Sequence, residues 1–306
     1  MKNGVYIYLL ITLLVGFAVG YAIKSPANKM PLPTSIYENG SSNPDIRLKE
    51  KYKFTNPLLE CAGTINSFVP INDLKKSLED YINNRRSQGK VTDVAVYYRD
   101  LDNGPTLGIN EYISFSPASL VKVPLMMVYF KLFEDDPGIL TKKIAVTKNP
   151  DETYNQMDIV PKDKIKQGTE YTTEELITRM IVYSDNVAYD LLYDAIGVDK
   201  IMVIYKDLGV DISKSNTDAK DNYMTLKDYS AFFRILYNAS YLDHNMSEKA
   251  LQIMSKSTYM DGIVAGVPKG IVVAHKFGER AYDTIQEKQL HDCGVIYTPQ
   301  KTIYFA

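Results

Sequence analysis

The feature that most constrains the fold of this chain is the order of its hydrophobic patterns. Residues 91–101 are rich in β-branched and aromatic side chains and predict a strand; Asn103-Gly104, a strong hairpin signal, leads to a second strand at 106–109. Three more strand patterns follow near the end of the chain, at residues 271–275, 291–298 and 301–305. We therefore expect the two ends of the folded region to meet in one sheet.

Helical patterns fill the middle of the chain and also precede the first strand. Leu74, Leu78, Tyr81 and Ile82 recur at helical spacing, with Asn72 or Asp73 placed to cap that helix. The further predicted helices cover residues 119–134, 174–183, 186–197, 198–208, 225–240 and 246–257. The fold class predicted is α/β (α+β), with an antiparallel sheet formed by both ends of the chain and an inserted all-helical lobe. The cleft between two such lobes is a natural ligand site.

The amino terminus predicts export from the cytoplasm. Residues 5–23 carry no charge, and as a helix they would extend ~28 Å, close to the thickness of a bilayer's hydrocarbon core. Gly20-Tyr21-Ala22 could serve as a signal-peptide cleavage site, but the apolar run is longer than a usual signal core. We expect residues 1–24 to form a single-pass membrane anchor with an extracytoplasmic domain, or a signal segment of a secreted protein.

Composition supports one folded domain on a tether. Residues 25–60 are rich in Pro, Ser, Asn and Gly and lack periodicity, so they predict a flexible linker before a domain at 61–306. Hydrophobic residues make up 45% of the chain and charged residues 24%, which is ordinary for a protein with a buried core. The net charge of −2 provides no field for gathering nucleic acid, and we expect no such partner.

The two cysteines, Cys61 and Cys293, would lie at opposite ends of the folded region. In an exported chain they are expected to form a disulfide, because paired cysteines persist outside the cytosol. Closing a loop of this length would stabilise the fold by about 4–5 kcal/mol in the loop-entropy model. The alternative is two unrelated buried thiols.

Three short motifs could carry chemistry. Ser119 begins a predicted helix, and Lys122, three residues later, shares its face. If that lysine is buried, its pKa falls and it can take a proton from the hydroxyl. Ser184-Asp185-Asn186 stands between two helical patterns, and Lys276-Phe277-Gly278 stands at the end of a strand. Taken singly, each motif is more often a helix cap or a solvated lysine.

Together, S-x-x-K, S-D-N and K-x-G in this order resemble the motifs of class A β-lactamases and penicillin-binding proteins. The resemblance extends from about residue 62 to the end of the chain. It implies that Ser119 is acylated, that Lys122 is its base and that Ser184 passes the proton to the leaving group. It also implies that Asn186 and Gly278 border the substrate, that Lys276 attracts a substrate carboxylate, and that the amides of Ser119 and Glu279 form an oxyanion hole. No cofactor or metal is implied.

Three departures from the family pattern stand out. Phe277 replaces a Thr or Ser whose hydroxyl helps bind a carboxylate, and Arg280 could compensate. No Glu occurs between Glu175 and Glu248, where class A enzymes carry the base for deacylation. The possible substitutes are Asp211, Asp218 and Asp221. We therefore predict slow hydrolysis of the acyl-enzyme, since a positioned base contributes about 10²- to 10⁴-fold. The C-terminal helix usual in the family is also missing, which would leave a sheet face bare.

Other readings are weaker or remain open. A His-based serine hydrolase lacks its G-x-S-x-G motif, and His291-Asp292-Cys293 is a poor zinc site because successive side chains alternate across a strand. The expected substrates are β-lactams or peptidoglycan stem peptides. The alternatives are a D-Ala-D-Ala carboxypeptidase or transpeptidase, and a non-catalytic module that binds the cell wall.

Overall fold

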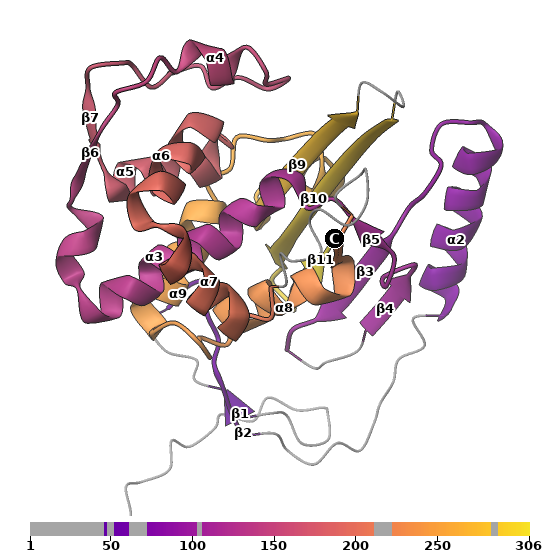
Figure 1. Cartoon of the computed structure of the whole chain (residues 1–306). Helices are drawn as coiled ribbons and strands as arrows, with labels where there is room; N and C mark the ends of the chain where they lie inside the picture. The colour runs from indigo at the N-terminus through magenta and orange to yellow at the C-terminus, as the bar shows by residue number, and fades with distance from the viewer. Residues whose placement is uncertain (1–45, 48–51, 61–71, 103–105, 211–221, 283–286) are drawn as a thin grey trace, which may run out of the picture. The chain divides into compact units, whose positions relative to one another are not determined.

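The computed structural model describes residues 46–47, 52–60, 72–102, 106–210, 222–282 and 287–306 (Figure 1). The chain divides into two compact units, residues 1–42 and 43–306, and every described residue belongs to the second unit. Several predicted features lie outside the described residues: the apolar segment 5–23, Cys61, the Asn103-Gly104 turn, and the aspartates Asp211, Asp218 and Asp221.

A five-stranded antiparallel sheet joins the two ends of the folded region, as the sequence predicts. Its strand order is β4-β3-β11-β10-β9. The strands are β3 (Val96–Asp100), β4 (Thr106–Ile109), β9 (Val272–Tyr282), β10 (Glu287–Tyr297) and β11 (Thr302–Phe305). The last strand, β11, pairs with β3, so Ile303 lies opposite Asp100 although some two hundred positions separate them. Strand β9 forms one edge of this sheet.

Strands β9 and β10 are longer than their apolar patterns indicate. They pair without a break from Val272 opposite Tyr297 to Tyr282 opposite Glu287. The sequence predicts only residues 271–275 and 291–298, because charged residues occupy much of the distal half of the hairpin. The backbone ladder continues where the apolar alternation stops, and this extension carries the strand past Lys276.

The helical lobe is inserted between β4 and β9. Its principal helices are α3 (Lys122–Asp135), α5 (Thr173–Val182), α6 (Asn186–Ile196), α7 (Val198–Asp207), α8 (Leu226–Tyr237) and α9 (His244–Met254). Shorter elements are η1 (Ala118–Val121), η2 (Pro137–Leu140), α4 (Asp151–Tyr154), α10 (Ile263–Gly266), and the strand pairs β5 (Ser114–Phe115) with β8 (Met224–Thr225) and β6 (Lys143–Ala145) with β7 (Glu170–Thr172). The predicted helices are confirmed to within a few residues at each end.

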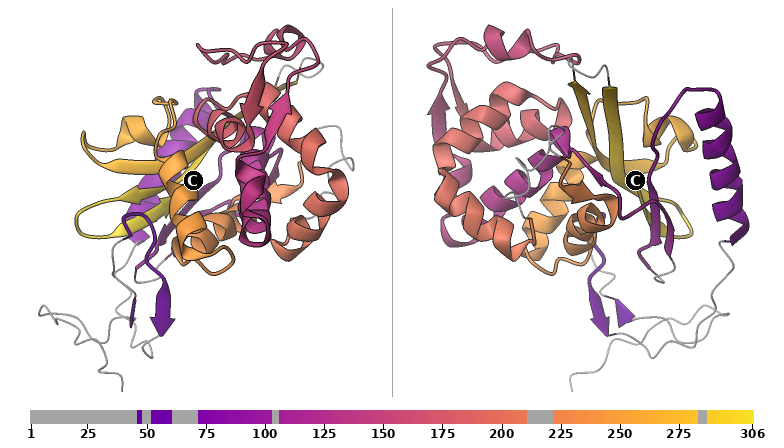
Figure 2. Two further views of the ribbon diagram at one scale, coloured as in Figure 1. Left: turned by 90° about the vertical axis from the view of Figure 1, so that its left-hand side faces the viewer. Right: turned by 45° about the vertical axis from the view of Figure 1, so that its right-hand side comes forward.

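Helix α3 forms the centre of the core. Its residues from Lys122 to Phe130 are all buried, and it contacts α5, α7 and α9 (Figure 1). The same hydrophobic cluster continues to the sheet through Val295 and Tyr304. Helix α2 (Asn72–Ser87) lies apart from the helical lobe and packs Ile82 on β3 and β4 (Figure 2).

The segment before α2 is attached to α9 by a carboxylate. Glu248 accepts hydrogen bonds from the amides of Lys53, Phe54 and Thr55, at 2.7, 2.9 and 2.9 Å. The Thr55 hydroxyl lies 3.1 Å from the same carboxylate, and Tyr52 stacks on the His244 ring with centroids 3.5 Å apart. We call this group, Tyr52 to Thr55 with His244 and Glu248, the Glu248 clasp.

Two further expectations concern the cysteines and the membrane. Cys293 is a free thiol, fully buried in β10, so the expected disulfide with Cys61 is not supported. The physical reason is its position: Cys293 lies inside the core beside Tyr304. Within the described ranges, no helix combines the length and apolar character that a membrane span requires. The anchor at residues 5–23 stays a prediction.

Candidate active site

Ser119 lies in a short helical turn that leads into α3. Turn η1 follows Pro117, and the backbone at Ala118 has a φ of 47°, a left-handed conformation that is unfavourable for a residue with a side chain. Ser184 also has a positive φ, of 55°. Strained backbone of this kind persists only where the surrounding structure holds it, and it is enriched at functional sites.

Lys122 brings Ser119 and the S-D-N segment together. Its ammonium nitrogen, Nζ, lies 2.9 Å from Ser119 Oγ, 3.1 Å from Ser184 Oγ and 2.6 Å from Asn186 Oδ1. It also donates to the Ser184 carbonyl at 2.7 Å. The lysine is only 2% exposed, and burial lowers its pKa to about 7 although Asp185 and Asp190 act in the opposite direction. Lys122 is therefore buried, which is the condition under which the sequence analysis expects its pKa to fall.

Asp185 positions the residues on either side of it. It is the N-cap of α6, and its carboxylate accepts hydrogen bonds from the amides of Val187 and Ala188 and from the Tyr154 hydroxyl, at 2.9, 3.3 and 3.0 Å. The carboxyl is fully buried, and burial raises its pKa despite these bonds. Asp185 thereby fixes where α6 begins and so where Asn186 lies. Capping is the role that the isolated motif indicates.

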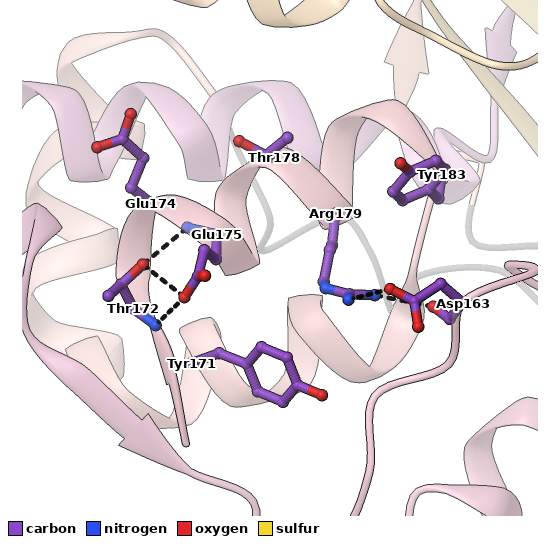
Figure 3. A pocket seen from close by; sticks show the side chains of 8 residues that line it. All are labelled: Asp163, Tyr171, Thr172, Glu174, Glu175, Thr178, Arg179 and Tyr183. Carbon is purple, nitrogen blue, oxygen red and sulfur yellow. Dashed lines mark hydrogen bonds and ion pairs between the residues drawn. The ribbon is translucent and has the colours of Figure 1, made fainter. Parts of the chain in front are cut away.

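Helix α5 supplies the other support for the S-D-N segment. It begins with a capping box in which Thr172 and Glu175 bond each other's backbone amides. At its other end, the Arg179 carbonyl accepts from the amides of Tyr183 and Asp185. Figure 3 shows the pocket beside this helix, where the Arg179 side chain is held by Asp163. None of the motif serines and lysines lines that pocket, so its contribution to the site is structural.

Lys276, on strand β9 of the sheet, also contacts Ser184. Its Nζ donates to Ser184 Oγ at 2.8 Å and to the Phe277 carbonyl at 2.6 Å. The side chain is fully buried, and burial, together with the nearby Lys122, holds its pKa well below the ordinary lysine value. Ser184 Oγ therefore lies between two buried amines. The structure brings together all four residues that the motifs single out.

Gly278 allows the sheet edge to lie against the turn η1, which carries Ser119. A Cβ at this position would lie 3.2 Å from both the Pro117 carbonyl oxygen and the Ser119 amide nitrogen. That spacing is tight, so a side chain there would push β9 away from η1. The close approach places the β9 backbone, and with it the residue after Gly278, beside Ser119.

The next two residues of β9 border the site without joining the hydrogen-bonded group. Glu279 is half-buried; burial and the neighbouring Asp158 raise its pKa. Arg280 is exposed, and its guanidinium lies 5.4 Å from the centre of the Tyr282 ring. Neither contacts Ser119, Lys122 or Ser184 through a hydrogen bond among the described residues.

An aromatic pair beside Lys276 escaped the sequence reasoning. Phe277 is 3% exposed and stacks on Tyr259 with ring centroids 4.2 Å apart and planes 18° apart. Tyr259 belongs to the segment after α9, where the Thr258 amide and hydroxyl both donate to the Val182 carbonyl, at 3.0 and 3.1 Å. No local pattern marks Tyr259, because its partner is close only in the folded chain.

The histidines near the sheet edge do not form a metal site. His275 and Asp292 make a buried contact of 2.8 Å between Nδ1 and Oδ1. Asp292 also accepts from the Ile263 amide, which fastens α10 to β10. Over the part of the chain that the structure describes, no three metal-ligating side chains gather in one place.

Comparison with known proteins identifies the family. A model of the beta-lactamase enzyme family matches residues 73–306. The β-lactamase VEB-1 of Pseudomonas aeruginosa is 25% identical over 215 residues, covering 65% of this chain and 71% of VEB-1. The extended-spectrum β-lactamase PER-1, also of Pseudomonas aeruginosa, is 26% identical over 225 residues, covering 69% of this chain and 72% of PER-1.

Solved structures share the fold at lower sequence identity. The TLA-3 extended-spectrum β-lactamase superposes with a TM-score of 0.66 at 22% identity, over 76% of this chain and 88% of its own. PBP-A superposes with a TM-score of 0.60 at 19% identity, over 79% of this chain and 88% of its own. The family model covers most of the chain, and both kinds of neighbour share its fold. The chain therefore belongs to the beta-lactamase enzyme family, within the serine hydrolases that resemble β-lactamases and penicillin-binding proteins.

Proposed function

We propose that this protein forms an acyl-enzyme at Ser119 with β-lactams or with the amide bonds of cell-wall stem peptides. The observation that carries the proposal is the contact of 2.9 Å between Ser119 Oγ and Lys122 Nζ, made by a buried lysine whose pKa is about 7. An amine with that pKa is uncharged in a substantial fraction of molecules at neutral pH. It can therefore accept the hydroxyl proton as the oxygen attacks.

In acylation, one proton would pass from Ser119 to Lys122 and then, through Ser184, to the leaving nitrogen. Lys122 takes the proton from Ser119, and Oγ bonds to the substrate carbonyl carbon. The resulting oxyanion accepts hydrogen bonds from the amides of Ser119 and Glu279. Ser184, which touches both amines at 3.1 and 2.8 Å, passes a proton to the leaving nitrogen as the carbon–nitrogen bond breaks, and Lys122 resupplies Ser184.

The surrounding residues would orient the substrate. The Asn186 side-chain oxygen is engaged by Lys122 at 2.6 Å, which leaves its NH₂ group to face a substrate amide oxygen. The absence of a side chain at Gly278 keeps β9 close to η1, so that a substrate bound along β9 would lie beside Ser119. Arg280, exposed on the same strand, is the candidate for binding a substrate anion.

We propose that hydrolysis of this acyl-enzyme is slow. No Glu occurs between Glu175 and Glu248, and Asp185 is committed to capping α6. Without a carboxylate positioned to activate the water, its attack on the ester would lose about 10²- to 10⁴-fold. This favours a D-Ala-D-Ala carboxypeptidase or transpeptidase as the second candidate function. A solved PBP-A variant is an acyl-enzyme complex with penicillin G, which supports acylation within this fold.

The deciding experiment is to incubate the full-length chain, in mild detergent, with labelled benzylpenicillin and to follow its intact mass. We expect one penicilloyl adduct, absent in Ser119→Ala, that persists over many minutes. Rapid return to the free mass with product release would indicate an efficient β-lactamase. Absence of any adduct and of stem-peptide cleavage would favour the non-catalytic module. A membrane anchor at residues 5–23 is part of the same proposal, tested by membrane fractionation with and without that segment.

A further inference from the structure

We infer that the stacked rings of Phe277 and Tyr259 close the site beyond Lys276 and keep a free carboxylate away from its amino group. The preferred substrate would then carry an uncharged group there, such as an ester or a further peptide unit. This inference rests on the proposed function, because it concerns which substrates reach Ser119. We call these two rings the aromatic cap.

The first argument is that Lys276 has no donor left for a ligand. The Lys276 amine has three N–H bonds when protonated and two when neutral. Ser184 Oγ and the Phe277 carbonyl occupy two of them, at 2.8 and 2.6 Å. The Phe277 ring covers the remaining side, with its centroid 4.2 Å from Nζ, the geometry of a cation–π contact. With none of the side chain exposed, an incoming carboxylate would have to displace one of these partners.

The second argument is that the cap is held in place. Phe277 is 3% exposed and Tyr259 packs on its face. Thr258 is bonded twice to the Val182 carbonyl, and the Tyr259 ring lies against Gly262, where an added Cβ would be only 2.9 Å from its edge. Turning either ring aside would break a stacked aromatic pair and a close-packed contact.

The third argument is the sign of the charge beside the cap. Glu279 follows Gly278 on β9, and Asp158 is close enough to raise its pKa. Glu279 lies within electrostatic range of Lys276 and Tyr259, so a substrate carboxylate beside the cap would meet a like charge. Lys288 is paired with Asp158 at 3.7 Å. The exposed cation on the strand is Arg280, four residues from Lys276 and on the same face, roughly 13 Å along the strand at the usual rise. A substrate anion is therefore accommodated further along the strand rather than beside the scissile bond.

The test compares benzylpenicillin with its methyl ester, which differ only in the carboxylate. Second-order rate constants for acylation are measured by intact mass on the full-length chain, for the wild type and for Phe277→Thr. We expect Phe277→Thr to raise the ratio of acid to ester rates at least tenfold. Tyr81→Thr, an aromatic-to-threonine change on the exposed side of α2, is the matched control and should leave the ratio unchanged.

A second variant guards against misfolding of the first, since Phe277 is buried. Tyr259→Ala removes the outer ring from a half-buried position and is expected to shift the same ratio in the same direction by at least threefold. An unchanged ratio in folded Phe277→Thr and Tyr259→Ala would overturn the aromatic cap while leaving acylation at Ser119 intact. If neither compound acylates any variant, the proposed function itself has failed.

Discussion

The two lysines around Ser184 and the glutamate of the Glu248 clasp are all ionisable groups that are partly or fully buried, but their surroundings differ greatly. Glu248 receives three backbone amides and a hydroxyl, all within 3.1 Å. Lys122 and Lys276 meet hydroxyl, amide and carbonyl oxygens, and neither has a carboxylate within hydrogen-bond distance among the described residues. The Glu248 carboxylate is held by hydrogen-bond donors on several sides, whereas the two lysines have no carboxylate as a counterion within hydrogen-bond distance in the parts of the chain that the structure describes.

The surroundings of Glu248 favour stability of the fold, whereas those of Lys122 and Lys276 favour reactivity. Amide dipoles that converge on a carboxylate favour its charged form and stabilise the fold. Buried amines without a counterion favour the neutral form, as the lowered pKa values of both lysines show. A neutral amine is a base, so the arrangement that costs stability at the cleft is the one that can activate Ser119.

The largest expected effect comes from removing the base. We predict that Lys122→Met slows acylation of Ser119 by about 10²- to 10⁴-fold, because the hydroxyl loses its proton acceptor. Thermal stability should change little, because the desolvation cost of the buried amine is removed while oxygens of Ser184 and Asn186 lose their donor. Stopped-flow acylation and calorimetry on one preparation measure both quantities. A Lys122→Met protein with a lowered Tm but a normal acylation rate would show that Lys122 stabilises the fold and is not the base.

The pH dependence of acylation should report the same lysine. Lys122 acts as a base only when neutral, so the rate rises with pH and levels off above a pKa of about 7. Below that pKa, the protonated fraction grows and the rate falls about tenfold per pH unit. Rates of adduct formation between pH 5 and 9 give the inflection. An inflection near the ordinary lysine pKa would mean that the amine is solvated in solution.

For a variant of Glu248, in the clasp, we expect a loss of thermal stability with little change in the acylation rate. Glu248→Gln removes the charge that the Lys53, Phe54 and Thr55 amides bond, which should cost about 2–3 kcal/mol and lower Tm by roughly 5–10 °C. Acylation of Ser119 in the folded protein should stay within about twofold of wild type. The readouts are thermal unfolding and penicillin labelling. A large loss of labelling without loss of Tm would show that the clasp and the cleft are coupled.

The smallest expected effect is on thermal stability and concerns the cap of helix α5, which supports the S-D-N segment. Thr172→Ala removes the capping-box hydroxyl and should cost about 1 kcal/mol, lowering Tm by roughly 2–4 °C. Thr178→Ala, in the middle of the same helix, is the matched control and should be neutral or slightly stabilising because Ala favours the helix. Equal losses in both variants would argue that helix packing, rather than the cap, is being measured.

Local sequence was sufficient for the elements and for the principal residues of the site. Helical and strand periodicities predict α3 and α5 to α9 and the meeting of both ends in one sheet, since each pattern reflects which face of its element is buried. Ser119, Lys122, Ser184 and Lys276 were singled out by the order of three motifs that together resemble a known family, because each motif taken singly is more often a cap or a solvated lysine. The extension of β9 beyond Lys276 was missed because a hydrogen-bond ladder does not require apolar residues.

Tertiary structure alone decided how these segments meet. The approach of Lys276 to Ser184, 92 positions earlier, depends on β9 packing against η1 at Gly278. Three other features likewise depend on residues that share no local pattern. They are the stacking of Tyr259 on Phe277, the Glu248 clasp and the burial of Cys293 as a free thiol. A sequence records the periodicity of each element, but the partners of its side chains exist only after the elements pack, and that packing sets the desolvation that lowers the pKa of Lys122.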